Sequence, residues 1–148
     1  MAGRTPQLEL DNQLCFALYD ASRAVVRAYG PLLDELGLTY PQYITMLVLW
    51  ESDGPVSMGD IGARLHLDSG TLTPLIKRLV QLAVVERERD AADERRVLIS
   101  LTSQGEALRQ TACTVPERIF ARFGMDLGLA RQLLQNLNHL VVELKRQP

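Results

Sequence analysis

The 148-residue sequence has few cysteines and no long apolar run, and each shortage excludes a class of protein. Cys15 and Cys113 are too few for a disulfide scaffold. Only His66 and His139 accompany them, and no cluster has the spacing of a zinc site, so we expect both histidines at the surface or in caps. The longest apolar stretch, residues 43–50, is much shorter than the roughly 18 residues of a membrane span. We therefore expect no metal, no cofactor and no membrane contact.

The sequence also lacks a basic surplus, because its formal net charge is -2. Net charge therefore gives no sign of nucleic-acid binding, and any DNA interface has to be argued from local arrangement. Residues 1–6 lack the apolar stretch of a secretory signal, which predicts a cytoplasmic protein. Ordinary apolar and charged fractions, 47% and 23%, indicate one folded domain.

Apolar residues at helical spacing dominate the chain. They predict a first helix from Asp11, broken or kinked at Gly30-Pro31 and ended by Gly37. Further helices are expected over 39–50, 57–65, 68–81, 103–123 and 126–146, with a kink at Pro116, and with Thr39, Ser57, Asp68 and Asp126 as caps. A period of two predicts strands over 84–89 and 96–101, joined by a polar tip.

A helix pair followed by a two-stranded hairpin is the order of a winged helix-turn-helix. We therefore predict a mainly α protein with a small β-hairpin, in which residues 55–102 bind DNA. The outer segments, 8–50 and 103–146, carry more apolar surface than so small a module needs, which predicts a homodimer built on their helices. An all-helical monomer with an incidental hairpin is the alternative.

Side chains of the predicted module suit double-stranded DNA. Small hydrogen-bonding residues open the helix 68–81 and cations follow, while an arginine on a wing suits the narrow minor groove. The predicted DNA-binding residues are Asp68, Ser69, Thr71, Thr73, Lys77, Arg78, Arg95 and Arg96. A capped surface helix and a solvated turn are the plain alternatives. Residues 71–96 include six Lys/Arg and five Asp/Glu, so their net charge is nearly zero. DNA binding therefore depends on acids that point away from the groove.

The pattern Asp93-x-Arg95-x5-Leu101-Thr102-x2-Gly105 resembles the wing of the MarR family of dimeric bacterial transcription regulators. Three segments are similar to its organic-hydroperoxide sensor (OhrR) subgroup, namely 10–19 (LDNQLCFALY), 37–43 (GLTYPQY) and 67–75 (LDSGTLTPL). The resemblance covers the chain from about Leu10 to Leu144. It implies a homodimeric repressor that senses organic hydroperoxides and releases a pseudo-palindromic operator, and not an enzyme.

Cys15 is the candidate sensing residue. It falls just inside the first turn of the predicted helix, where the helix dipole favours the thiolate that attacks peroxides. Tyr29 lies about 21 Å farther along the same helix, so the two side chains could meet only between antiparallel helices of two subunits. The resemblance implies this contact, with Tyr29 and Tyr40 of the other subunit beside Cys15 and Tyr19 as a further candidate. The plain alternative is a small buried cysteine.

Cys113 has two possible roles under the resemblance. Some members form a mixed disulfide with a small thiol, and others form an inter-subunit disulfide with a resolving cysteine that follows a Pro-Glu-x-x-Phe-like stretch. Here Ala121, and not a cysteine, follows the matching stretch 116–120, and Cys113 lies eight residues before Ala121. Cys113 is thus either a displaced resolving cysteine or a bystander.

Two other functions fit the residues. One is a regulator of the same family that responds to a phenolic or carboxylate ligand and would keep its response without Cys15. The other is a thiol peroxidase that turns over many peroxides per Cys15. The recognition helix and the wing would have no purpose in such an enzyme.

Overall fold

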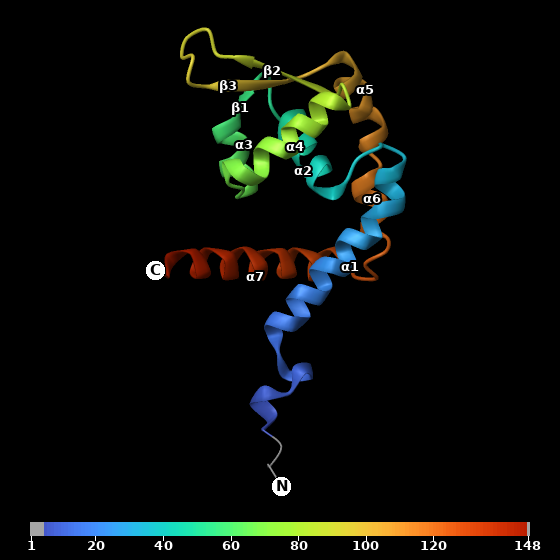
Figure 1. Cartoon of the computed structure of the whole chain (residues 1–148). Coiled ribbons are helices and arrows are strands. Elements are labelled where there is room, and N and C mark those ends of the chain that lie inside the picture. The colour runs from blue at the N-terminus through green and yellow to red at the C-terminus, as the bar shows by residue number, and fades with distance from the viewer. Residues whose placement is uncertain (1–4, 148) are drawn as a thin grey trace.

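The computed structural model describes residues 5–147, which form helices and a small antiparallel sheet (Figure 1). The α-helices are α1 (Leu14–Asp34), α2 (Tyr40–Trp50), α3 (Met58–Leu65), α4 (Ser69–Gln81), α5 (Ser103–Ala112), α6 (Val115–Phe120) and α7 (Leu127–Arg146). The strands are β1 (Val56–Ser57), β2 (Val85–Arg89) and β3 (Val97–Leu101), and two short 3-10 turns, Pro6–Leu8 and Leu10–Asn12, precede α1. The predicted fold class is confirmed.

The elements form a compact head and two extended helices (Figure 1). In the head, α2, α3 and α4 pack beneath the sheet, and the β2–β3 hairpin projects beyond them as a wing. The chain then descends through α5 and α6 beside the upper end of α1, and α7 runs underneath the head. One apolar core joins the end of α1 to the head and to α6, with Leu32, Met46, Ile76, Ile99 and Ile119 among its residues.

Most of the predicted helix starts are confirmed, because the capping residues accept the hydrogen bonds that the first helical turn leaves open. Backbone N–H groups donate to Ser57 Oγ (3.1 Å), Asp68 Oδ1 (2.8 Å) and Asp126 Oδ1 (2.9 Å) at the starts of α3, α4 and α7. At the start of α2, the backbone N–H of Thr39 donates to Gln42 Oε1 at 2.9 Å, as in a capping box.

The predicted boundaries of the first helix are wrong in two places. Asp11 lies in a 3-10 turn and Gln13 is the N-cap of α1, because the Gln13 amide donates to the carbonyl oxygens of the preceding turns and fixes the chain there. The helix also continues through Pro31 to Asp34 without a break. Burial of Leu32 and Leu33 offsets the one backbone hydrogen bond that proline removes.

The predicted helix 103–123 is two helices. The chain turns at Cys113 and Thr114, because Pro116, in the first turn of α6, supplies no N–H for a bond back to Ala112. The hairpin also has a third strand that was not predicted: β1 pairs with β3 and gives the order β1-β3-β2. Two residues are too short for a strand pattern to show in the sequence.

Gly105 sits where the wing joins α5, and its neighbours leave no room for a side chain. A Cβ at Gly105 would collide with the backbone carbonyl of Val84. Thr102 Oγ1 donates to the Ala83 carbonyl at 2.7 Å and accepts from Gly105 N–H at 3.0 Å, while Trp50 Nε1 donates to the Gly105 carbonyl at 3.0 Å. This close approach gives a structural reason for the spacing Leu101-Thr102-x2-Gly105.

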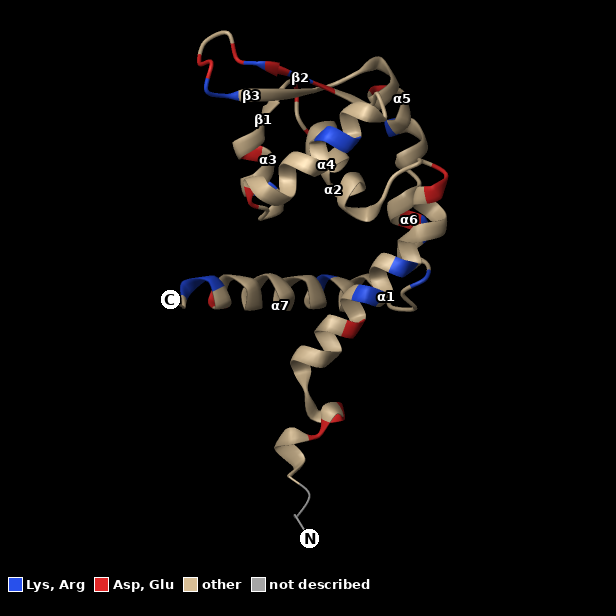
Figure 2. Ribbon diagram, in the orientation of Figure 1, with Lys and Arg blue, Asp and Glu red and all other residues tan. Residues whose placement is uncertain are grey.

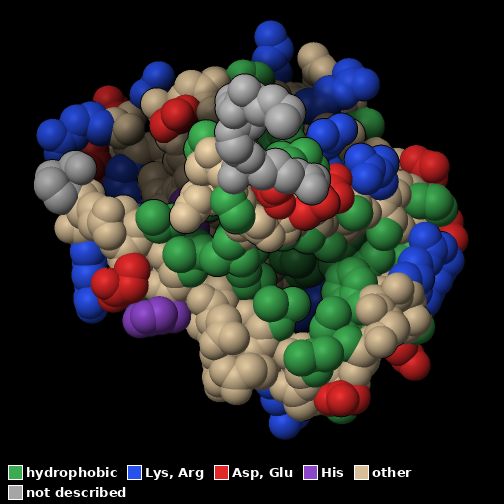
Figure 3. Space-filling model, turned by 90° about the horizontal axis from the view of Figure 1, so that it is seen from below, with side chains coloured by type: hydrophobic (Ala, Val, Ile, Leu, Met, Phe, Trp, Pro, Cys, Tyr) green, Lys and Arg blue, Asp and Glu red, His purple; other side chains and the backbone are tan. Residues whose placement is uncertain are grey.

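The lower part of the molecule exposes a large apolar surface. None of the residues of α7 is buried, and a groove of about 310 Å³ runs between α1, α6 and α7. Figure 3 views this end and shows hydrophobic side chains gathered over it. They include Leu14, Phe16, Tyr19, Val26, Leu127, Leu133, Leu134, Val141 and Leu144. Surfaces of this kind mark protein interfaces.

The cytoplasmic prediction rests partly on residues 1–4, which lie outside the residues that the structure describes. Between residues 5 and 147, no helix is both long and apolar enough to cross a bilayer. The same range contains no group of three or more His, Cys, Asp or Glu side chains placed to hold a metal ion.

Candidate redox and DNA-binding sites

Three tyrosines cluster where α1 meets α2. The ring centroids of Tyr29 and Tyr40 are 4.8 Å apart, and those of Tyr29 and Tyr43 are 5.7 Å apart. Burial, together with the neighbouring hydroxyls of Tyr40 and Tyr43, raises the pKa of Tyr29 to about 12. Burial likewise raises the pKa of Tyr43. The hydroxyls of Tyr29 and Tyr43 therefore stay protonated at neutral pH and are available as hydrogen-bond donors.

Cys15 lies at the opposite end of α1, in its first turn, and its side chain is exposed. Its predicted partner Tyr29 lies fourteen residues along the same helix, about 21 Å away at about 1.5 Å per residue. Tyr19 is one turn from Cys15, and its exposed ring packs against the Arg23 guanidinium at 5.4 Å. One chain therefore brings Tyr29 and Tyr40 together but does not bring Cys15 to them.

Cys113 is exposed at the end of α5, and its thiol donates to the Gln110 carbonyl at 2.9 Å. It lines a small apolar cavity of about 170 Å³ with Tyr43, Trp50 and Pro116 among its neighbours. Neither cysteine forms a disulfide in the chain. The structure thus places the two thiols on different parts of the molecule, α1 and α5.

The helix α4 presents its predicted DNA-binding residues to solvent. Leu72, Ile76 and Leu79 are buried in the core, whereas the predicted DNA-binding residues of the helix are exposed, namely Ser69, Thr71, Thr73, Lys77 and Arg78. Asp68 caps the helix, and the Thr71 N–H and hydroxyl hold the pKa of its carboxyl below the usual range. The Asp68 carboxylate caps and orients the first turn of α4, so Asp68 has a structural role.

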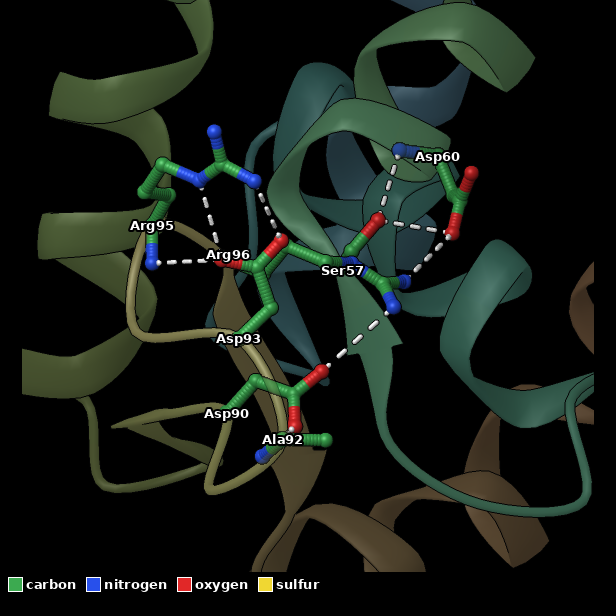
Figure 4. A network of polar contacts seen from close by, with 7 residues as sticks. All are labelled: Ser57, Asp60, Asp90, Ala92, Asp93, Arg95 and Arg96. Atoms are coloured by element: carbon green, nitrogen blue, oxygen red, sulfur yellow. Dashed lines mark hydrogen bonds and ion pairs between the residues drawn. The ribbon is translucent and has the colours of Figure 1, made fainter.

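The wing carries the other predicted arginines. Arg95 is 91% exposed, and its guanidinium is held by Asp93, with Nε 3.1 Å from Oδ1. These hydrogen bonds hold the pKa of Asp93 below its usual range. Arg96 turns the other way and pairs with Asp90 in the wing and with Asp60 in α3 (Figure 4). Sequence reasoning missed Asp60 and Asp90, since Asp60 reads only as an acid in the first turn of a helix.

Strand pairing separates the charges of the wing. Arg87 pairs with the buried Ile99 and Glu88 pairs with Leu98, and cross-strand partners share a face of the sheet. Arg87 therefore lies on the face that α4 covers, and Glu88 lies on the opposite face. Figure 2 shows basic residues on α4 and on the wing, with acidic ones interspersed at the wing and at the start of α3. The strand acids thus point away from the α4 side, as DNA binding requires.

The head is firmly attached to α1. Arg118 of α6 forms a bidentate ion pair with Glu35 at the end of α1, at 2.7 and 2.8 Å, and holds the pKa of that carboxyl below its usual range. Arg122 donates to the Ala28 carbonyl at 3.0 Å, beside the tyrosine cluster. These contacts join α6 to the C-terminal half of α1, and the shared apolar core joins that end of α1 to the head.

Known proteins with similar sequences are transcription regulators. The chain matches the family described as transcriptional regulator SarA/Rot over residues 27–111. It is 49% identical over 142 residues to the HTH-type regulator TtmR of Methylorubrum extorquens, covering 96% of this chain and 72% of TtmR. It is 44% identical over 140 residues to the organic hydroperoxide resistance transcriptional regulator of Bacillus subtilis, covering 95% and 90% of the two chains.

Solved structures agree with the sequences. Reduced AbfR of Staphylococcus epidermidis bound to DNA is 35% identical with a TM-score of 0.78, and the match covers 93% of this chain and 96% of that one. Overoxidised AbfR bound to DNA is 39% identical with a TM-score of 0.71, covering 92% and 99%. The resemblance read from the wing and from the segment around Cys15 is confirmed, and the chain belongs to the MarR/SarA-type family of winged-helix transcription regulators.

Proposed function

We propose that this protein is a homodimeric, DNA-binding repressor that senses organic hydroperoxides through Cys15 and then releases its operator. One observation carries the proposal: Cys15 is exposed in the first turn of α1, beside the exposed apolar side chains of Leu14 and Phe16, in a fold whose relatives include a hydroperoxide-resistance regulator. AbfR, a structural neighbour, has been seen on DNA in reduced and overoxidised states. These relatives favour regulation by oxidation over turnover of peroxide.

The dimer completes the sensing site. The exposed apolar faces of α1 and α7 need a partner, and an identical chain supplies complementary faces about a two-fold axis. Antiparallel crossing of two α1 helices places Cys15 beside Tyr29 of the partner subunit. The hydroxyls of Tyr29 and Tyr40 would donate hydrogen bonds to the thiolate and orient the peroxide, and exposed apolar side chains such as Phe16 favour organic hydroperoxides.

The chemistry needs only the thiolate, the peroxide and a small thiol. The Cys15 sulfur attacks one peroxide oxygen, so that an S–O bond forms, the O–O bond breaks and the leaving alkoxide takes a proton to become the alcohol. The cysteine is oxidised to the sulfenic acid and the hydroperoxide is reduced. A small thiol then condenses with the sulfenic acid, forming a disulfide and releasing water.

Release of DNA follows from the geometry of the dimer. Two α4 helices have to match half-sites about one helical turn apart on the duplex. A bulky group on Cys15 would separate the tyrosines from α1 of the partner and shift that helix. The Arg118–Glu35 pair would pass the shift to α6, and the apolar core at the end of α1 would pass it to the head. Because both heads must fit one duplex, a small change in their spacing weakens binding strongly.

Fluorescence anisotropy tests the proposal on a labelled fragment of the DNA upstream of the gene for this protein, at stated salt. Binding should be tight for the reduced dimer. Binding should be lost after one equivalent of cumene hydroperoxide with a small thiol present. When the peroxide is in excess, its consumption should stop near one per chain. Binding that survives oxidation would contradict sensing, and repeated turnover would favour a thiol peroxidase.

A ligand-responsive regulator remains a second candidate because of one cavity. About 250 Å³ of space lies between α4 and the segment joining α1 to α2, and the cation Arg78 and the acid Asp34 line it together with Gln42. Arg78 could pair with a small carboxylate there, although Asp34 carries the same charge as such a ligand. A response to such ligands that persists in Cys15→Ser would favour this candidate.

Arg95→Ala should weaken binding of the upstream fragment about thirtyfold, because each of two wings loses a minor-groove contact of about 1 kcal/mol. The fold should be unaffected, since Arg95 is 91% exposed. Arg95→Lys is the control that keeps the charge but loses the planar guanidinium, and it should bind with intermediate affinity. Equal affinity of Arg95→Ala and wild type, measured by anisotropy, would remove the wing from the mechanism.

A further inference from the structure

Arg96 stands next to Arg95 in the sequence but has different surroundings. Arg95 points into solvent at 91% exposure, whereas Arg96 is 50% exposed and lies between two carboxylates (Figure 4). Its Nη1 is 3.4 Å from Asp90 Oδ2, and its Nη2 is 3.7 Å from Asp60 Oδ2. One guanidinium thus bridges the base of the wing tip and the first turn of α3.

Both carboxylates are themselves fixed. Asp60 Oδ2 accepts a hydrogen bond of 2.6 Å from Ser57 Oγ, the residue that caps α3. Asp90 is 15% exposed, and its Oδ1 accepts from Ala92 N–H at 2.8 Å. The Asp90 N–H also donates to the Arg96 carbonyl at 3.0 Å. Arg96 is therefore attached to an ordered point on each side.

The wing needs such an attachment, since its third strand is short. β1 pairs with β3 only at Leu98 and Ile99. Arg96 lies two residues beyond Leu98 toward the tip, so its ion pair with Asp60 extends the attachment of the hairpin to the head. The neighbouring Arg95 lies on the part of the hairpin that the ion pair between Arg96 and Asp60 attaches to the head.

We propose that Arg96 is a positioning residue, which fixes the wing to α3 through Asp60 and Asp90 and so presents Arg95 to the minor groove, instead of contacting DNA itself. The inference rests on the proposed function as a DNA-binding protein. It replaces the sequence-based expectation that Arg96 binds DNA directly. In this arrangement Asp60 and Asp90 promote DNA binding although both are negatively charged.

The sign of the effect of a neutralised acid separates the two roles. If Arg96 contacted phosphate, Asp60→Asn would free it and remove a repelling charge, so binding of the upstream fragment would tighten. As a positioning residue, Arg96 loses its anchor in Asp60→Asn and in Asp90→Asn, and we expect binding about threefold to fivefold weaker. Asp90→Asn keeps the acceptor for Ala92 N–H and leaves α3 untouched, so a weakened helix cannot explain its effect.

The matched control is Glu88→Gln, which neutralises an exposed wing acid that no contact in the described structure ties to Arg96. Its affinity should equal or exceed that of the wild type. Arg96→Gln removes both ion pairs and should weaken binding at least as much as Asp60→Asn, and the double variant Asp60→Asn/Arg96→Gln should be no weaker than Arg96→Gln alone. The slope of log affinity against log salt should stay unchanged in Arg96→Gln, whereas a lost phosphate contact lowers it by about one for each wing.

Hydrogen exchange of the free protein tests the attachment without DNA. Amides of residues 90–96 should exchange faster in Asp60→Asn, Asp90→Asn and Arg96→Gln than in the wild type or in Glu88→Gln. Unchanged exchange, tighter binding by Asp60→Asn or a lowered salt slope in Arg96→Gln would each overturn the proposal. If the wild type bound no DNA, the proposed function would fail, and the exchange rates would still decide whether Arg96 holds the wing.

Discussion

Cys15→Ser should abolish the response to organic hydroperoxide and leave the reduced affinity for DNA unchanged. The hydroxyl that replaces the thiol is a poor nucleophile toward peroxide, so no S–O bond forms and α1 keeps its place in the dimer. After treatment with cumene hydroperoxide and a small thiol, the wild type should bind its upstream DNA about 100-fold more weakly, at the upper range of coupling between two sites. The variant should bind as before, as measured by anisotropy at one salt concentration.

Cys113→Ser is the matched control, because it removes the other exposed thiol by the same atom exchange. With a small thiol supplied, this variant should respond like the wild type. A non-reducing gel of the oxidised wild type, run without added thiol, then separates the two fates of Cys15. A linked dimer that disappears in Cys113→Ser shows a resolving cysteine. In a parallel sample oxidised with the small thiol present, a monomer whose mass has increased by that of the thiol shows a mixed disulfide. Loss of DNA binding in oxidised Cys15→Ser would contradict the sensing role of Cys15.

Gly105→Ala should destabilise the fold by about 3 kcal/mol, which is more than 100-fold in the unfolding equilibrium. The added Cβ would displace the Val84 carbonyl. That movement disturbs the bonds from Thr102 to Ala83 and from Trp50 to Gly105, which join the wing, α5 and α2. Urea unfolding at fixed protein concentration measures the change, because the stability of a dimer depends on concentration.

Gly54→Ala is the control for the glycine exchange. Gly54 lies in an exposed turn, and a Cβ there meets no atom within 4 Å. The free energy of unfolding of Gly54→Ala should stay within about 0.5 kcal/mol of that of the wild type. If Gly105→Ala and Gly54→Ala unfolded at the same urea concentration, the backbone at Val84 would move aside at little cost. The packing reason for the wing motif would then be wrong.

Local interactions explain which parts of the fold could be predicted. Helices α2, α3, α4 and α7 begin where a side chain caps the first turn within three residues, and such signals are visible in the sequence. The strands of the wing show as a period of two. Two of the errors arose where contacts between distant parts of the sequence outweigh local preference. Buried Leu32 and Leu33 carry α1 through Pro31, and β1 exists only because β3 lies beside it.

The candidate sites divide in the same way. Residue types and spacing were enough to predict the family, the order of a winged helix-turn-helix and the candidates Cys15, Tyr29 and Arg95. Which side chains meet could not be predicted in this way. Folding brought Tyr29 to Tyr40 and held Arg96 between Asp60 and Asp90, because contacts between elements follow from packing and not from separation in the chain.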